Sequence, residues 1–511
     1  MSRLACRHGR VRGVSAPARE GIGTERELDP RRWRALAVCV TALFTTLLDV
    51  SIVTVALPSI GRATGAGPAE LQWVVSGYAL AFGMVPIIAG RLGDDRGRRL
   101  MLLIGIGAFT AFSVVVGLAP TAGVLIAGRV FQGLAGGLVN PQVSGVVQQL
   151  FPLHERGRAF GVIGTAVGVA TAAGPVVGGA IIGLGGETFG WRLCFLVNLP
   201  VGVTSFLLCR AWLPAPPPRG ARRPLDLPGA GLLALGVLGV LFPAVQYDAG
   251  HDARLAVLIV PALAVLATFV YWEHGPARRR GYPLIDLGLF RVRSYAAGVA
   301  LALVFFSGYT GAPLVLAFFL QDGLGFSALH AGATASAFAV GATVAAPIAG
   351  RLLPRLGSRV LVAGLLSFAV GTAACALVAL ATAGSVPPAA VGLALAVPLL
   401  VAGLGGGSVI TPNQALSLAE VDVRGGSTAG GTLQTAQRIG NAVGAAVITA
   451  VFYAAVREAP ATGAARQEQY AHAYALALAV SVLFALAAAV LAVQERRGRR
   501  TAAPAPVPDA T

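Results

Sequence analysis

Apolar residues occur in long runs along this chain, separated by short polar stretches that contain most of the charged residues. A helix needs about 20 apolar residues to cross the hydrocarbon core of a bilayer. The pattern therefore predicts an all-α polytopic membrane protein with 14 transmembrane helices. The predicted spans lie at roughly 34–58, 71–92, 100–119, 121–147, 159–184, 194–213, 227–247, 253–273, 295–320, 328–353, 358–382, 389–418, 427–456 and 473–493.

The composition supports this fold class. Of 511 residues, 56% are hydrophobic and only 12% are charged, and the mean hydropathy is +0.74. A soluble domain carries about 25% charged residues, so this chain lacks the polar surface that a soluble protein of its length needs. The composition excludes a soluble enzyme, a disordered chain and a disulfide scaffold.

The basic residues indicate the topology. All 39 are arginine, they outnumber 22 acids, and the net charge is +17. With the N-terminus inside, 32 arginines fall in the tails and inner loops and 5 in the outer loops. Arginine accumulates on the cytoplasmic side of membranes, so both termini are predicted to be cytoplasmic. No polar domain is large enough to present a basic face to nucleic acid. The absence of lysine is typical of GC-rich bacterial coding, so the membrane is predicted to be that of a bacterial cell.

Short motifs recur in the same order in both halves of the chain. The sequence IAGRL occupies Ile88–Leu92 and again Ile348–Leu352, and residues 174–180 resemble residues 440–446. A parallel repeat of this kind is found in transporters built from two similar bundles. The predicted organisation is a cytoplasmic basic tail (1–33), an N-terminal six-helix bundle (34–213), a linker with two extra transmembrane helices (214–293), a C-terminal six-helix bundle (294–494) and a cytoplasmic tail (495–511).

Several motifs, taken in order, resemble those of the major facilitator superfamily, and in particular its 14-helix drug:proton antiporter family. They are Leu48–Pro58, Gly90–Arg99, Arg129–Gly133, Gly174–Gly179, the set Trp191, Arg192, Phe195, Asn198, Pro200 and Gly202, and Pro283–Arg291. Two positions depart from the family pattern, because Asp95 stands where a basic residue is usual and Ala170 where a glycine is usual. The resemblance implies two six-helix bundles plus two inserted helices that work by alternating access.

Two charged residues are candidates for proton coupling. Asp49 is the only acid well inside a predicted span, and Arg129 lies about nine residues into another. A charge at the bilayer centre is costly and usually marks a pathway. Asp49 would be protonated in one access state, and Arg129, as the resemblance implies, would favour its ionised form in the other. The alternatives are an Asp49 paired with arginine or capping a broken turn, and an Arg129 that ties helices together.

Two glycine-containing motifs are candidates for conformational change. The loop between the second and third helices would latch the inner gate by contact with another helix end, through Gly90, Asp94, Gly97, Arg98 and Arg99. The alternative is that its arginines serve topology alone. The fifth helix would act as a hinge that biases the cycle toward export, as the resemblance implies, through Gly174, Pro175, Gly178 and Gly179. The alternative there is close packing alone.

Polar residues within spans are candidates for the substrate cavity, although each is more often a hydrogen bond between helices. They are Gln72, Tyr78, Gln132, Asn140, Gln142, Gln434 and Arg438. For Arg438 a structural tie is favoured, to Gln434 or Asn441 one helical turn away. The spacing of the cysteines and histidines predicts no metal site.

The function predicted from these features is proton-coupled multidrug or small-molecule efflux, by an antiporter that is no enzyme and has no cofactor. Its partners would be protons, a hydrophobic small molecule and the lipid bilayer. Energy would come from the proton gradient, because no ATP-binding motif is present. The alternatives are an exporter dedicated to one metabolite or to the host's own antibiotic, an uptake symporter, and a membrane receptor that does not transport. The oligomeric state stays open.

Overall fold

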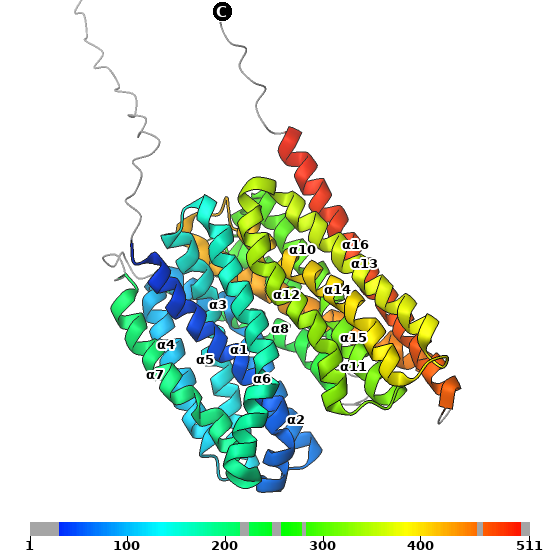
Figure 1. The fold of residues 1–511 in the computed structure, drawn as a ribbon. Coiled ribbons are helices and arrows are strands. Elements are labelled where there is room, and N and C mark those ends of the chain that lie inside the picture. The colour runs from blue at the N-terminus through cyan, green and yellow to red at the C-terminus, as the bar shows by residue number, and fades with distance from the viewer. Residues whose placement is uncertain are drawn as a thin grey trace, which may run out of the picture.

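The computed structural model describes residues 30–214, 224–247, 257–277, 279, 283–456 and 463–501. Helices joined by short connections make up this part of the chain, which contains no strand (Figure 1). The helices are α1 (Arg32–Thr64), α2 (Pro68–Met84), α3 (Pro86–Arg96), α4 (Arg98–Gly117), α5 (Ala122–Leu150), α6 (Leu153–Leu196), α7 (Asn198–Trp212), α8 (Leu227–Tyr247), α9 (Ile259–Trp272), α10 (Arg293–Tyr309), α11 (Gly311–Phe318), α12 (Ala328–Leu356), α13 (Ser358–Thr382), α14 (Pro388–Ser417), α15 (Gly426–Val456) and α16 (Gly463–Thr501), with short 3₁₀ or π segments η2 (Glu273–Ala277), η3 (Leu287–Arg291), η4 (Phe319–Gly323) and η5 (Val423–Gly425).

The predicted all-α membrane fold is confirmed. In the described residues, 11 helices are long and apolar enough to cross a membrane, and the bent pair α2–α3 brings the number to 12. The shorter apolar helices α8 and α9 occupy the two remaining predicted spans. Because the apolar stretches of these two that could be tested, Leu227–Pro243 and Ile259–Gly275, are shorter than a full span, the count of 14 spans stays a prediction.

Local sequence explains where the helices break. The axes of α2 and α3 differ by 47° at Val85, where Pro86 removes a backbone donor and disfavours helix in the preceding residue. Within α6, Gly186 has φ 71°, a conformation that favours glycine, and it separates the fifth predicted span from the sixth. The last helix continues to Thr501, beyond the predicted end of its span, so the beginning of the predicted C-terminal tail is helical.

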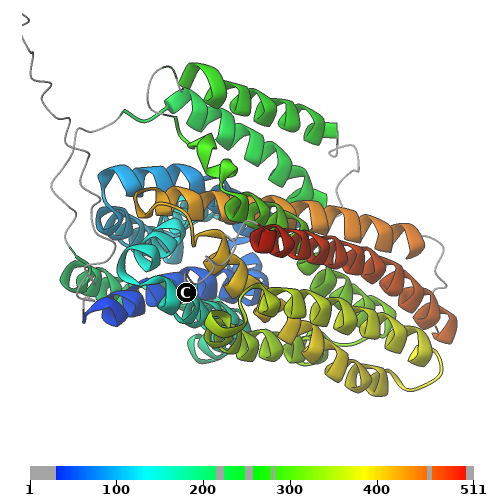
Figure 2. The same cartoon turned by 90° about the horizontal axis from the view of Figure 1, so that it is seen from above.

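The helices form two bundles and a hairpin. Helices α1–α7 pack into the first bundle and α10–α16 into the second (Figure 1). The hairpin α8–α9 lies along one side of both bundles (Figure 2). One apolar cluster joins Leu80 of α2, Leu241 of α8 and Ala442 of α15, so the hairpin bridges the two bundles.

The two bundles meet at one end of the molecule, which we call the basic end because α1 begins there at Arg32 and α16 ends there. Here α6 packs on α12 so closely that a Cβ on Gly350 would lie 2.3 Å from the carbonyl oxygen of Gly157. At the opposite end the helices of the two bundles diverge (Figure 1), and Leu184 of α6 and Leu329 of α12 are 91% and 81% exposed. The structure therefore has the basic end closed.

Candidate functional site

A buried ion pair lies inside the first bundle. The Arg129 Nη1 of α5 donates to the Asp49 Oδ2 of α1 at 2.5 Å, and both side chains are almost completely buried. Placing either charge alone among apolar helices is costly, and the pair reduces that cost for both.

Amide side chains complete the environment of the Asp49 carboxylate. Its Oδ1 accepts hydrogen bonds from the Gln132 Nε2 at 3.1 Å and from the Asn198 Nδ2 at 2.8 Å. The Gln132 amide also donates to the Ser113 hydroxyl at 2.7 Å. We call Asp49, Ser113, Arg129, Gln132 and Asn198 the carboxylate cluster. It joins α1, α4, α5 and α7 through one charged group.

The guanidinium of Arg129 is held from its other sides by α2. Its Nε donates to the Val74 carbonyl oxygen at 3.1 Å, and its carbon Cζ lies 4.2 Å from the centre of the Tyr78 ring. The Tyr78 hydroxyl donates to the carbonyl oxygen of Thr46, so this ring is fixed as well. The arrangement fits the structural alternative, a tie between helices. It also provides an acid whose charge is matched by one cation.

The sequence did not single out two members of this cluster as site residues. Asn198 belongs to a motif that resembles the antiporter family, and that motif was the available signal. Ser113 lies in an apolar run and carries no pattern that distinguishes it from other serines. Its role depends on α4 lying beside α5 and α7, which only the tertiary structure shows.

A second polar cluster joins the bundles at the basic end. The Asp94 carboxylate accepts hydrogen bonds from the backbone N–H groups of Ser427 and Thr428 at 3.0 and 2.8 Å, and from the Thr428 hydroxyl at 2.8 Å. These amides form the N-terminus of α15, where the helix dipole favours negative charge. Asp94 therefore caps a helix of the other bundle.

Arg98 extends the same junction. Its guanidinium pairs with Asp94 at 3.0 Å, donates to the Ser427 hydroxyl at 3.0 Å and also donates to the Val423 carbonyl oxygen. Gly90 permits the close approach, because a Cβ there would lie 2.3 Å from the Ser427 carbonyl oxygen. We call Gly90, Asp94 and Arg98, with the first turn of α15, the junction.

The other predicted loop residues lie beside the junction. Gly97 adopts φ 105° between α3 and α4, where its lack of a side chain permits the turn. Arg99 donates to the carbonyl oxygen of Arg210 on α7, in its own bundle. Asp95, the departure from the family pattern, pairs with Arg91 of the same helix at 3.0 Å.

Of the three glycines predicted to act in the fifth span, two pack on α1 and one does not. A Cβ on Gly174 would lie 2.1 Å from the Ser51 Cβ of α1, and Gly178 packs on Ile52 of the same helix. Gly179 has nothing within 4 Å of its Cβ position, and Pro175 is exposed. The hinge function of this segment stays a prediction.

Most predicted cavity residues lie apart from one another. Gln132 belongs to the carboxylate cluster, and Gln142 donates to the Ala89 carbonyl oxygen at 2.8 Å. Gln72 and Asn140 are half-buried at separate places on α2 and α5. The amide of Gln434 is buried, and its oxygen has no hydrogen-bond partner.

The predicted tie of Arg438 to Gln434 or Asn441 is wrong. In the described part of the chain the Arg438 guanidinium forms no hydrogen bond or ion pair, and its carbon Cζ lies 4.6 Å from the centre of the Phe82 ring. Asn441 instead accepts a hydrogen bond from Thr310. Arg438 points across to α2 because it lies on the side of α15 that faces the first bundle.

Two buried acids were not recognised from the sequence. Asp226, just before α8, accepts hydrogen bonds from the Trp272 indole at 2.8 Å and the Gly229 amide at 3.2 Å. Glu273, just after α9, accepts from the backbone amides of Leu284 and Ile285 at 3.1 and 3.4 Å. Asp226 therefore joins α8 to α9 at the base of the hairpin, and Glu273 fastens this base to the segment that follows.

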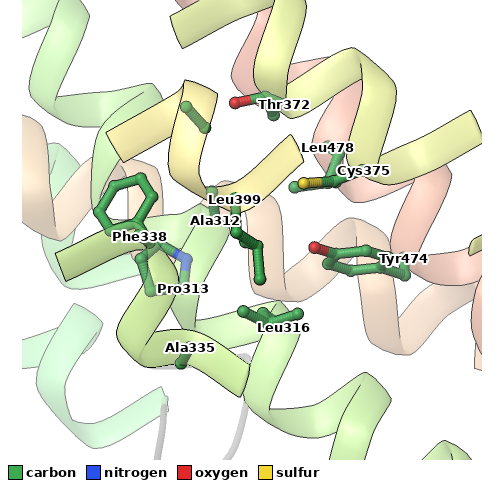
Figure 3. A pocket seen from close by; sticks show the side chains of 11 residues that line it. Ala312, Pro313, Leu316, Ala335, Phe338, Thr372, Cys375, Leu399, Tyr474 and Leu478 are labelled. Atoms are coloured by element: carbon green, nitrogen blue, oxygen red, sulfur yellow. The ribbon is translucent and has the colours of Figure 1, made fainter. Parts of the chain in front are cut away.

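A small cavity lies inside the second bundle, lined by Pro313, Phe338, Thr372, Cys375 and Tyr474 among others (Figure 3). Its volume is about 40 Å³. Pockets for drug-sized ligands have several hundred Å³, so this cavity does not hold the substrate in the present state. Among the described residues, no group of three or more His, Cys, Asp or Glu side chains could hold a metal ion.

Comparisons with known proteins identify the family. The family described as "Major Facilitator Superfamily" matches residues 39–445 and, a second time, residues 297–508. The chain is 38% identical to the probable actinorhodin transporter of Streptomyces coelicolor, over 83% of this chain and 73% of that protein. It is 33% identical to the puromycin resistance protein pur8 of Streptomyces alboniger, over 83% and 82% respectively.

A solved structure has the same fold. The proton:xylose symporter XylE superposes with a TM-score of 0.60, covering 89% of this chain and 94% of that one, at 14% identity. This likeness concerns the fold alone, whereas the family match covers most of the sequence. The chain is a multi-pass membrane protein that belongs to the major facilitator superfamily of transporters.

Proposed function

We propose that this protein is a proton-coupled exporter of small hydrophobic compounds in a bacterial cell membrane. The names of its relatives support export, since they include an antibiotic transporter and an antibiotic resistance protein. The arginine distribution supports an orientation in which the basic end is cytoplasmic. The closed basic end would then make this an outward-facing state.

The carboxylate cluster is the observation on which the proposal depends. Asp49 carries a charge inside an apolar bundle, and one cation, Arg129, compensates it. Protonation of Asp49 would remove the attraction between α1 and the Arg129 guanidinium, so the two helices could move apart. Ionisation would restore the pair. Proton binding and helix packing are thereby linked through one contact.

The junction would convert this change into alternating access. Opening the basic end requires Asp94 to leave the N-terminus of α15 and Arg98 to leave Ser427. Uptake of an outside proton by Asp49 would favour this opening, and release of the proton to the cytoplasm would favour closure. A proton gradient would then drive substrate outward.

The direct test is Asp49→Asn in inverted membrane vesicles that export a fluorescent dye. Asparagine keeps an acceptor oxygen for Arg129 and removes the titratable group, so we expect loss of transport driven by a pH gradient. Dye exchange in the absence of a gradient should persist. Asp322→Asn, at an exposed acid of η4, is the matched control and should transport normally. Full gradient-driven transport by Asp49→Asn would refute the coupling role.

An exporter dedicated to one compound is the second candidate, because each of the two relatives is named for one antibiotic. A susceptibility panel on a strain that lacks the protein separates the two functions. Sensitivity to many unrelated drugs would support multidrug export, and sensitivity to one chemical class would support dedicated export.

A further inference from the structure

Arg438 lies within a span and has no anionic partner among the described residues. It lies 12 residues after the start of α15, which places it about 18 Å along the helix from the basic end. Its side chain is half-buried, and in the described residues its only polar or ring contact is the one with Phe82. A cation–π contact compensates only part of the cost of a charge at this depth.

The other arginine within a span, Arg129, shows how a buried guanidinium is fully paired in this protein. Arg129 has a carboxylate partner, an amide oxygen and a backbone carbonyl, all within hydrogen-bonding distance. Arg438 has none of these. Its guanidinium therefore keeps its capacity to bind an anion.

Arg438 lies on the side of α15 that faces the first bundle. Ser427, Gly431, Gln434 and Arg438 follow one another at spacings of three or four residues, so they share one helix face. The first two lie against α3, where a Cβ on Gly431 would be 2.3 Å from the Pro86 carbonyl oxygen. Gln434 and Arg438 continue this face further along α15, away from its start at the closed end.

Aromatic and polar groups adjoin this guanidinium. The rings of Phe82 and Tyr78 are stacked with centres 5.8 Å apart, and Phe82 is the ring that Arg438 covers. The unpartnered amide oxygen of Gln434 lies one turn before Arg438 on the same helix face. Tyr78, Phe82 and Gln434 are themselves buried, so the half-buried guanidinium of Arg438 is the group of this set that stays accessible where the two bundles face each other.

We infer that Arg438 binds an anionic group of the transported compound. The compound would be an organic anion whose carboxylate or phenolate pairs with Arg438. This inference rests on the proposed export function, and it narrows the substrate class from hydrophobic compounds to those that carry a negative charge.

Two dyes with the same tricyclic ring and opposite charge provide the test: fluorescein, an anion, and rhodamine 6G, a cation. Binding of each to the purified full-length protein is measured by fluorescence anisotropy without a pH gradient. The wild-type protein should bind fluorescein more tightly. Arg438→Gln should weaken fluorescein binding at least tenfold and leave rhodamine 6G binding unchanged or stronger, because one charge-assisted contact is lost. Arg438→Lys should recover part of the fluorescein affinity.

The matched control is Arg466→Gln, near the start of α16, which removes the same charge from another half-buried arginine that covers an aromatic ring, and both dyes should bind it as they bind the wild type. Unchanged fluorescein binding by Arg438→Gln would overturn the inference, and so would equal loss of both dyes in a protein with wild-type circular dichroism. If Arg438→Gln does not fold, Arg438→Lys, which keeps the charge, must retain the preference for fluorescein over rhodamine 6G for the inference to stand.

Transport by the same protein in proteoliposomes separates this inference from the proposed function. One outcome is that the protein binds fluorescein through Arg438 but moves neither dye under a pH gradient. This outcome would support the anion site and refute proton-coupled export. The converse outcome is that rhodamine 6G moves under a pH gradient in both the wild type and Arg438→Gln, while the wild type does not bind fluorescein. This outcome would support export and refute the anion site.

Discussion

Replacement of Asp94 by asparagine tests how the basic end is held closed. In the structure the carboxylate accepts hydrogen bonds from two backbone amides and one hydroxyl at the N-terminus of α15. Asparagine has nearly the same shape but no charge, and one of its two terminal atoms is a donor that faces other donors. The substitution therefore weakens the junction without creating a cavity.

The magnitude follows from these contacts. A neutral hydrogen bond contributes about 1 kcal/mol, and a carboxylate roughly doubles that contribution. The two amides of Ser427 and Thr428 would each lose about 1 kcal/mol, whereas the Thr428 hydroxyl can reorient. A total of about 2 kcal/mol corresponds to a roughly thirtyfold change in the ratio of closed to open basic ends.

The distance between spin labels at the opposite end measures this ratio. Leu184→Cys and Leu329→Cys place labels on two exposed positions, one in each bundle. Cys6 is replaced by serine, and the four cysteines of the described residues are buried. Asp94→Asn should increase the population with a short distance, because opening the basic end brings the opposite ends together.

The neighbouring acid provides the control. Asp95 pairs with Arg91 of its own helix, so Asp95→Asn should leave the distance distribution close to that of the wild type. An Asp94→Asn protein with the wild-type distribution would refute the reasoning, because the carboxylate would then contribute nothing to closure.

Further predictions concern the first bundle. Asn198→Ala removes a buried donor to the Asp49 carboxylate and should destabilise the protein by about 2 kcal/mol; an unchanged thermal unfolding temperature in detergent would contradict this. Gly174→Ala inserts a methyl group against the backbone and side chain of α1 and should lower the unfolding temperature, at a cost of about 1–3 kcal/mol. Gly179→Ala meets open space and should lie within about 0.5 kcal/mol of the wild type. Equal effects of the two alanines would show that helix propensity, and not packing on α1, decides their stability.

Sequence reasoning located most helices because a membrane leaves few choices. Backbone groups in lipid must bond within their own helix, so an apolar run of sufficient length becomes a span whatever surrounds it. The bend at Pro86 and the break at Gly186 are also local effects. The hairpin α8–α9 was expected as an insertion, but its contact with α2 and α15 depends on packing between distant segments.

The candidate site was only partly predictable. Asp49 and Arg129 were recognisable because charges are rare in apolar runs, and Asp94 because its motif resembles that of a known family. Their partners were not recognisable. Asp94 bonds to residues more than 330 positions away, and no local pattern identifies the N-terminus of α15 as the group that it caps.

Arg438 shows most clearly where local reasoning ends. Neighbours one helical turn away were the natural partners to expect, since side chains at that spacing share a helix face. The tertiary structure directs this side chain to Phe82 of the other bundle instead. Hydropathy and charge thus determined which segments cross the membrane and which residues are unusual there. The free-energy cost of placing a residue in the bilayer depends on the residue type and its depth alone. The packing of one bundle against the other decided which of these residues meet, and it left Arg438 without an anionic partner in the part of the chain that the structure describes.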